Sequence, residues 1–440
     1  MPPETAVQSV TAASVAAADQ GHAGSRATGT ESARTPLSSV ARAGVKCLWI
    51  ARYIPYPLDA GAKVYSAKLA ESLAASGVTV RFMGIGESDA IPADCAHVDW
   101  LPIRHGRRSN IVALFSPLPN AAAIDASDAY TLSLQQQLEE DWDAIVLDGY
   151  GTGWALEACM RYRAERGVGR TRLIHVSHNH EERLWRDMAR GSRASPLRKL
   201  VLWQNYRKVR ALERRIVRSV DLLTTITEED RTSLGTALGR KRTLTLTPGY
   251  DGWVAPQRRI STHTPRRVIL MGSFRWVVKQ ENLARFVELA DPGFFRSGIE
   301  LDVVGDVPQE LLAILQPRCR ATRFHGFVKD VAAVFADARI AVVPEAIGGG
   351  FKLKFLDYFF ARVPVATLSH AAAGLPQELR EQTLACESLT ALVETIIANM
   401  DRLDELNLMQ EEAFARSCAR FTWHERAFNL KEAIVSPQYG

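Results

Sequence analysis

The residues best suited to chemistry follow three consecutive glycines, Gly348 to Gly350, which come directly after an apolar run. Glycines let backbone N–H groups approach a ligand closely, and a helix predicted to follow them points its positive N-terminus to the same place. Lys352 and Lys354 add positive charge, and the carboxylate of Asp357 can accept hydrogen bonds from ribose hydroxyls. The residues of this segment fit a site for a phosphorylated nucleotide, and they fit equally well a helix cap followed by an amphipathic helix with solvated lysines.

Two βαβ halves are predicted to position this segment. The strand Lys46–Ala51, the helix 62–76 and the strand Val78–Met83 form the opening unit, because the apolar positions change from strand to helix spacing and back. The other strands predicted for the first half are Ala144–Asp148, Leu173–Ser177, Asp221–Thr225 and Leu244–Thr247. The second half repeats the pattern with strands Arg267–Met271, Ile299–Val304, Arg323–Phe327 and Ile340–Pro344, and with helices 280–289 and 331–338.

The predicted fold class is therefore α/β, with two Rossmann-like, doubly wound domains. Residues 1–44 are rich in Ala, Ser, Thr and Gly, which predicts a disordered tail. We expect a first domain over 45–250, a linker over 251–265, a second domain over 266–415 and a final segment over 416–440. In open parallel sheets, ligands bind at the carboxyl ends of the strands, so the site should lie between the two halves.

The composition narrows the function classes. The chain has 440 residues, a net charge of +5, 47% hydrophobic and 23% charged residues, which is the balance of a soluble globular enzyme. The charge suits a protein that handles phosphates and is too small for a strong nucleic-acid footprint. The six cysteines are scattered singly, so no metal or disulfide framework is predicted and a cytosolic setting is favoured. No apolar run reaches the roughly 18 residues that span a bilayer, and no G-x-G-x-x-G follows the first strand, which disfavours a nicotinamide dehydrogenase.

The segment Gly348–Val365 resembles the donor motif of family-four-type (group 1) retaining glycosyltransferases. In that family, a glycine turn precedes a helix that reads x-x-L-E-A-M-A-x-G-x-P-V. Asp357 stands at the place of the family's second glutamate; the first glutamate of the Glu-x7-Glu pair falls by spacing on Gly349, and Glu345 lies too early. The resemblance implies that a nucleotide-sugar donor is bound by Gly349, Gly350, Lys352, Lys354 and Asp357.

A second match lies at the turn after the strand Arg267–Met271. In the family this turn reads Gly-Arg-x5-Lys-Gly, and its basic pair grips the donor diphosphate. Lys279 occupies the lysine place, Ser273 occupies the arginine place, and Arg275 is the candidate substitute. Because negative charge builds on the β-phosphate in the transition state, a fixed cation there lowers the barrier. We therefore assign Gly272 and Ser273 to donor binding, and Lys279 and Arg275 to catalysis.

The first half adds four candidates. Gly61 lies in a loop that resembles the family's glycine loop before the first helix, and we assign it to backbone approach at the donor. His178 follows a predicted strand at the place where the family has a histidine or asparagine that touches the donor sugar, and it is the third catalytic candidate; a loop histidine satisfied by its neighbours is the alternative. Asp59 and Asp148 are the carboxylates placed on the acceptor side, where they can act as a base if the enzyme inverts configuration.

Residues 190–218 are densely basic, with ten lysines and arginines against the single acid Glu213. Leu200, Trp203 and Tyr206 interleave with them. A basic amphipathic helix with an aromatic residue can lie on an anionic bilayer, where each cation near the surface contributes about 1 kcal/mol. A helix packed on the sheet with a solvated basic face fits the same residues.

The resemblance implies a GT-B fold whose C-terminal helix, after Phe421-Thr-Trp-His424, crosses back to the first domain. It implies an enzyme that moves a sugar from a UDP- or GDP-linked donor to a saccharide or lipid-linked acceptor of the cell envelope or an exopolysaccharide. We expect retention of configuration, no metal or other cofactor, no nucleic-acid partner, and a cytoplasmic enzyme that can be peripheral on the inner face of the membrane. The alternatives are a catalytically degenerate GT-B subunit and a nucleotide-sugar epimerase or inverting transferase.

Overall fold

The computed structural model describes residues 44–95, 97–104, 108–167, 169–191, 196–235, 242–346 and 350–436. The predicted tail, apart from Gly44, therefore lies outside the described residues, as does Gly349 of the predicted site.

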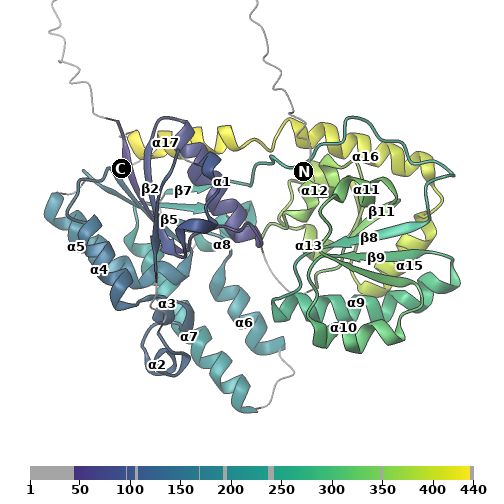
Figure 1. Cartoon of the computed structure of the whole chain (residues 1–440), viewed down its shortest axis with the longest axis horizontal. Helices are drawn as coiled ribbons and strands as arrows, with labels where there is room; N and C mark the ends of the chain where they lie inside the picture. Colours follow the sequence, from purple (N-terminus) through teal and green to yellow (C-terminus); the bar gives the residue numbers. More distant parts are fainter. Residues whose placement is uncertain are drawn as a thin grey trace, which may run out of the picture. The chain divides into compact units, whose positions relative to one another are not determined.

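Two parallel sheets organise the described chain (Figure 1). The first sheet has the strand order β3-β2-β1-β4-β5-β6-β7, and the second has the order β10-β9-β8-β11-β12-β13. The strands of the first sheet are β1 (Lys46–Tyr53), β2 (Thr79–Ile85), β3 (Asp99–Ile103), β4 (Ala144–Asp148), β5 (Arg172–Ser177), β6 (Leu222–Thr225) and β7 (Arg242–Thr245). The strands of the second sheet are β8 (Arg267–Met271), β9 (Glu300–Val304), β10 (Thr322–Gly326), β11 (Ile340–Val343), β12 (Val365–Leu368) and β13 (Thr383–Cys386).

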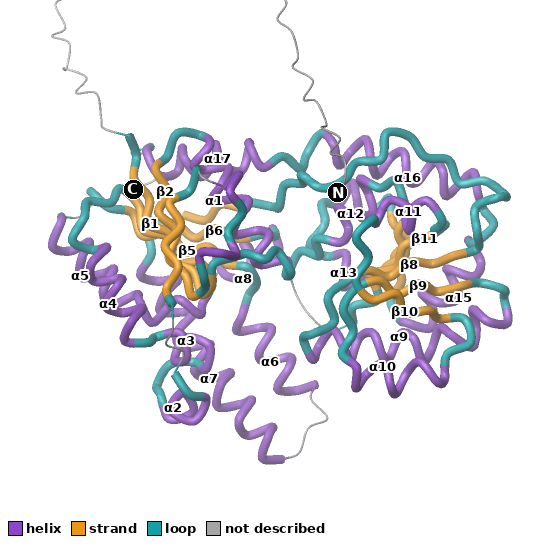
Figure 2. The backbone as a smooth tube through the Cα atoms, in the orientation of Figure 1, coloured by secondary structure: helices purple, strands orange, loops and turns teal. Residues whose placement is uncertain are grey.

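Helices cover both sheets (Figure 2). Those of the first half are α1 (Gly61–Ala75), α2 (Asn110–Phe115), α3 (Asn120–Asp125), α4 (Asp128–Gln137), α5 (Leu156–Arg166), α6 (Glu181–Gly191), α7 (Pro196–Ser219) and α8 (Glu228–Gly235). Those that follow are α9 (Val277–Arg296), α10 (Gln309–Leu315), α11 (Val331–Ala336), α12 (Lys354–Phe360), α13 (Ser369–Ala372), α14 (Gln377–Arg380), α15 (Leu389–Asn399), α16 (Leu403–Cys418) and α17 (Trp423–Val435). Among the described helices, none is both long and apolar enough to span a bilayer.

The architecture confirms the predicted fold class of two doubly wound halves. The inner strands read as continuous apolar runs because helices bury both of their faces; every residue of β4 is buried. Strand β3 contains Pro102 and was not predicted from the sequence. A proline cannot donate a backbone hydrogen bond, but β3 lies at the edge of its sheet, where such a residue is tolerated.

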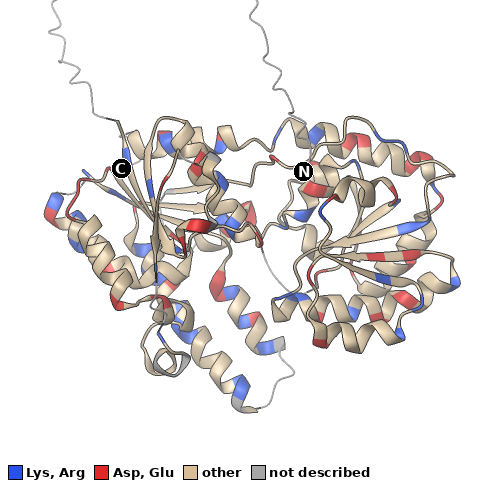
Figure 3. Cartoon of the chain, in the orientation of Figure 1, with Lys and Arg blue, Asp and Glu red and all other residues tan. Residues whose placement is uncertain are grey.

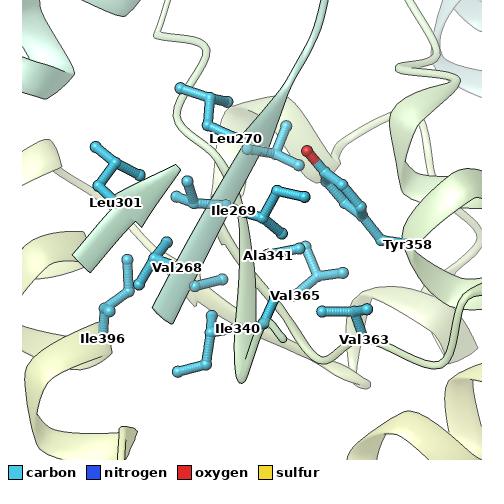
Figure 4. Packing of buried hydrophobic residues seen from close by; sticks show 14 of the residues in the cluster. Val268, Ile269, Leu270, Leu301, Ile340, Ala341, Tyr358, Val363, Val365 and Ile396 are labelled. Atoms are coloured by element: carbon cyan, nitrogen blue, oxygen red, sulfur yellow. The ribbon is translucent and has the colours of Figure 1, made fainter. Parts of the chain in front are cut away.

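The core of the second half connects the two predicted donor motifs. Side chains of β8 and β11, including Ile269 and Ala341, pack between the sheet and Tyr358 of α12 (Figure 4). Tyr358 is fully buried, and its hydroxyl oxygen accepts the backbone N–H of Met271 at 2.9 Å. The helix after the glycine run is thereby tied to the end of β8, where the second motif begins.

The chain ends by returning to the first half, which confirms the predicted C-terminal crossover. Helix α17 packs against α1 (Figure 1). Its Trp423 and Leu430 belong to the same buried cluster as Trp49 of β1. Gly249 allows this close approach, because a Cβ at that position would collide with the backbone nitrogen of Trp423.

Candidate active site

A pocket of about 460 Å³ lies at the carboxyl ends of strands from both sheets. Its wall is formed by the segments that follow β1, β5, β8 and β11, as expected for ligand sites in open parallel sheets. It brings together nine residues predicted from the sequence, namely Asp59, Gly61, His178, Gly272, Ser273, Lys279, Lys352, Lys354 and Asp357.

Three lysines give the pocket a positive wall. Lys354, at the start of α12, lies beside the turn after β8, because its Nζ would be 3.5 Å from a Cβ placed on Gly272. Burial lowers the pKa of Lys279, and the neighbouring charge of Lys354 lowers it further. Burial likewise lowers the pKa of Lys352 to about 8, with Lys354 and Lys279 adding to the effect. Cations that depress one another's pKa in a buried pocket form a site prepared for an anion.

Glu345 also lines the pocket, although its spacing from Asp357 in the sequence did not suggest it. It is 7% exposed, and its Oε1 accepts a hydrogen bond from Lys354 Nζ at 2.5 Å. Its buried Oε2 has no hydrogen-bond partner within the described part of the chain. Burial opposes the charged form, but Lys354 and Lys352 outweigh it and lower the pKa of Glu345. Its position two residues after β11, at the carboxyl end of a strand, is the sequence signal that could have identified it.

Asp357 lies in the first turn of α12. Burial raises its pKa to about 6, while a hydrogen bond with Tyr250 and the charge of Lys354 act in the opposite direction. Tyr250 is itself fixed by stacking on Phe360, with ring centroids 4.2 Å apart. Asp357 is thus a buried acceptor in the pocket wall, held by the segment that links the two halves.

Two predicted site residues, the catalytic candidate Arg275 and the donor-binding candidate Gly350, lie outside this pocket wall. Arg275 is absent from the pocket wall, and its largely exposed side chain forms an ion pair with Asp306. Gly350 lines a smaller neighbouring pocket together with Asn179. Its φ of +72° suits glycine, and a Cβ there would collide with Asn179 Oδ1, so the glycine lets the two halves of the chain approach closely.

The carboxylates of the first half also differ in their surroundings. Asp59 is half-exposed at the pocket and pairs with Lys63, with 2.9 Å between Nζ and Oδ1. Asp148 is 4% exposed and does not line the pocket; its Oδ1 lies 2.5 Å from His178 Nε2. Asp148 is therefore placed behind the pocket histidine, and we do not assign it the role of a base.

One group of described side chains has the spacing of a metal site, formed by His180, Glu182 and Glu213. Both carboxylate oxygens of Glu213 accept backbone N–H groups at the start of α6, at 2.8 and 2.7 Å. Glu182 is paired with Arg214 and Arg210. These contacts tie α7 to α6, so the group has a structural use within the protein.

The two Rossmann-like sheets, the cationic pocket at their carboxyl ends and the returning C-terminal helix define the class of GT-B glycosyltransferases. Two family models match the chain: a glycosyl transferase 4-like domain over residues 60–249, and glycosyl transferases group 1 over residues 265–402. The chain belongs to the group 1 glycosyltransferases.

Solved structures share this fold. One is Alr3699/HepE of Anabaena in complex with UDP and glucose, with 14% identity, a TM-score of 0.58, and coverage of 89% of this chain and 100% of that one. WaaG, a glycosyltransferase involved in lipopolysaccharide biosynthesis, is 17% identical, with a TM-score of 0.59 and coverage of 89% and 100%. A structure described as trehalose-6-phosphate from E. coli bound with UDP-2-fluoro glucose is 13% identical, with a TM-score of 0.58 and coverage of 88% and 98%. Among curated proteins, no sequence matches this chain significantly.

Proposed function

We propose that this glycosyltransferase takes a sugar from a UDP-linked donor and transfers it with retention to a saccharide or lipid-linked acceptor, without a metal ion. The observation that carries the proposal is the convergence of Lys279, Lys352 and Lys354 on one pocket wall beside Gly272. Three fixed cations can stabilise the charge of a departing diphosphate, which is the task that a metal ion performs in other enzymes.

The other pocket residues suit the remaining parts of such a donor. Asp357, with a pKa of about 6, is mostly ionised at neutral pH and can accept hydrogen bonds from ribose hydroxyls. Oε2 of Glu345, which no described residue contacts by a hydrogen bond, is an acceptor available to a hydroxyl group of the sugar. His178 lies on the opposite half of the same pocket. UDP as the nucleotide is supported by the UDP and UDP-sugar complexes among the similar structures.

Retention is supported by the positions of the two candidate bases. An inverting reaction needs a carboxylate or similar group within hydrogen-bond reach of the acceptor hydroxyl. Asp148 is buried behind His178, and Asp59 is paired with Lys63. Analysis of the anomer formed from a UDP-α-sugar decides the matter: an α-linked product supports retention, and a β-linked product contradicts it.

Thermal unfolding with UDP, GDP, ADP and dTDP tests the donor site. We expect UDP to raise the melting temperature, because a ligand at about 100 times its dissociation constant adds roughly 2.7 kcal/mol to the stability of the folded state. The rise should persist in EDTA and be lost in Lys279→Ala, since this lysine supplies part of the positive wall.

The matched control is Lys329→Ala, which removes an exposed lysine of the same half. It should keep the UDP response of the wild-type chain. If only another nucleotide raises the melting temperature, that nucleotide replaces UDP in the proposal. A rise that requires a divalent ion would contradict the metal-free mechanism. No response to any of the four would remove the diphosphate site and favour a catalytically degenerate subunit.

The proposed lipid-linked acceptor is supported by helices α6 and α7, along which Lys and Arg residues are frequent (Figure 3). Leu200 and Trp203 of α7 are 66% and 40% exposed, and Phe115 of the nearby α2 is 83% exposed. Exposed apolar side chains among cations are typical of a helix that lies on an anionic membrane surface.

Sedimentation with phosphatidylglycerol-containing vesicles tests this surface. The double variant Arg198→Glu/Lys199→Glu changes the charge by four units, and at about 1 kcal/mol per charge it should weaken binding at least tenfold. The control Arg296→Glu/Arg318→Glu makes the same change at exposed positions of the second half and should bind like the wild type. Equal loss in both variants, or no binding by the wild type, would contradict a membrane role for α7.

A further inference from the structure

A buried pair formed by Asp148 and His178 lies behind the pocket wall. Asp148 ends β4, and His178 follows β5, its neighbour in the sheet. Asp148 Oδ1 lies 2.5 Å from His178 Nε2, and Asp148 Oδ2 accepts the indole N–H of Trp49 at 2.8 Å. Ser66 of α1 also donates to this carboxylate. The carboxylate is therefore fixed from three elements of the first half.

The ring of His178 is fixed as well. Tyr65 packs edge-on against it, with ring centroids 5.5 Å apart, and Trp423 of α17 packs on Tyr65 at 5.7 Å. The Tyr65 hydroxyl donates to the carbonyl of Leu246 at 2.8 Å, so the supporting ring is itself anchored. Rotation of the imidazole would break the bond to Asp148 and this packing. The crossover helix from the end of the chain thus supports a pocket residue of the first half.

The second ring nitrogen of His178, Nδ1, is not used by the contact with Asp148. His178 lines the pocket, yet its Nδ1 is buried and has no hydrogen-bond partner among the residues that the structure describes. A buried polar atom without a partner is costly, so a partner supplied by a ligand explains it best. We propose that Asp148 is a positioning residue, which holds Nε2 and thereby presents Nδ1 of a protonated His178 to an oxygen atom of the bound sugar donor. This inference rests on the proposed donor site.

The charges around the ring favour the protonated form. Burial opposes the imidazolium, but Asp148 outweighs it, with a further contribution from Glu181, and the pKa of His178 is raised. Burial also acts against the ionised Asp148, yet His178, Ser66 and Trp49 lower its pKa. The other histidine nearby, His175, is buried with a pKa lowered to about 4, so it is neutral at physiological pH. Glu181, with a pKa raised by burial to about 7, adds partial negative charge.

Nitrogen NMR of the imidazole groups tests the pair directly, with His178→Gln used to assign the signal. In the free wild-type chain we expect His178 to be protonated on both nitrogens at a pH where ordinary histidines, with a pKa of about 6.5, are mostly neutral. In Asp148→Asn its pKa should fall by about one unit or more. The surface variant Asp89→Asn, at an exposed position of the same half, should leave the signal unchanged.

Addition of UDP-glucose then tests the ligand contact. Its binding should shift the Nδ1 signal, whereas UDP alone shifts it only if the contacted oxygen belongs to the diphosphate. In Asp148→Asn, kcat should fall at least tenfold while the dissociation constant of UDP changes less than threefold, and the pH dependence of kcat should move to lower pH. If that variant does not fold, the titration of the wild-type chain decides between the protonated and neutral ring.

Two results would overturn the inference. One is a His178 that is neutral in the free protein or titrates unchanged in Asp148→Asn. The other is an Nδ1 signal that does not respond to UDP-glucose in a sample where calorimetry shows binding. Failure of UDP and UDP-glucose to bind at all would instead contradict the proposed donor site. The titration of His178 in the free protein would still test its interaction with Asp148.

Discussion

The variant Lys354→Met should lose roughly 30- to 4,000-fold in kcat/KM for the sugar donor. Removing one partner of a buried ion pair costs about 2–5 kcal/mol, and each 1.4 kcal/mol is a factor of ten. The side chains of Lys354 and Glu345 are 12% and 9% exposed, so little solvent screens the pair. Without the lysine, the Glu345 carboxylate remains in the pocket as an unpaired negative charge and repels the diphosphate that the cations should hold. Steady-state kinetics and calorimetric titration with UDP would measure the loss.

Two companion variants separate this electrostatic effect from simple loss of packing. Lys354→Met/Glu345→Gln removes both charges and should recover part of the kcat/KM that the single variant loses, because no unpaired carboxylate is left to repel the diphosphate. Lys329→Met, at an exposed position, should keep wild-type kinetics. A kcat/KM of Lys354→Met within threefold of the wild type would contradict a role for this lysine in donor binding.

The variant Gly305→Ala should be less stable than the wild type by at least about 3 kcal/mol. Gly305 follows β9 with a φ of +125°, a conformation that residues with a Cβ rarely adopt. An added Cβ would also overlap the carbonyl oxygen of Gly272, which belongs to rigid backbone. Because Gly272 lines the pocket, relief of the overlap must move part of the donor site, and UDP affinity should fall together with stability. Chemical denaturation and UDP titration would measure the two effects.

Gly298→Ala is the matched control for the backbone effect. Gly298 has a φ of +63°, but a Cβ there would meet no atom within 4 Å. This variant should lose only about 1–2 kcal/mol, which is the usual cost of a left-handed conformation for a residue with a Cβ. Its affinity for UDP should be unchanged, because Gly298 lies in the turn between α9 and β9, at the amino end of that strand. The pocket lies at the opposite, carboxyl ends of the strands. Equal losses of folding stability in Gly305→Ala and Gly298→Ala would show that the overlap with Gly272 adds nothing to the cost of the backbone conformation.

Most of the fold could be predicted from the sequence because its signals are local. Buried parallel strands require continuous apolar runs, and the turns after them require glycine, so β1, β4, β5 and β8 were visible within a few residues of their true bounds. The edge strand β3 was missed since a proline interrupts its pattern. The short helices α2 to α4 were missed too, because they carry too few turns for a periodic signal.

Only part of the candidate site could be predicted from the sequence. Nine predicted residues meet in one pocket, because the segments after parallel strands converge at the same edge of a sheet. Arg275 pairs with Asp306 at the surface, and Glu345 enters the wall although its spacing from Asp357 did not suggest it. Motif spacing counts residues along the chain, whereas the loop between a strand and a helix decides where each side chain lies.

The sequence by itself determined the two βαβ halves, the glycine turns and the supply of lysines, because these depend on backbone preferences and on residue types close together in the chain. Only the tertiary structure decided which of these groups interact. The pair of Asp148 and His178 joins residues 30 positions apart, and its support by Trp423 comes from the far end of the chain. Burial and the charge of such distant partners set the protonation of a side chain, so its chemical role is decided when the two halves and the crossover helix come together.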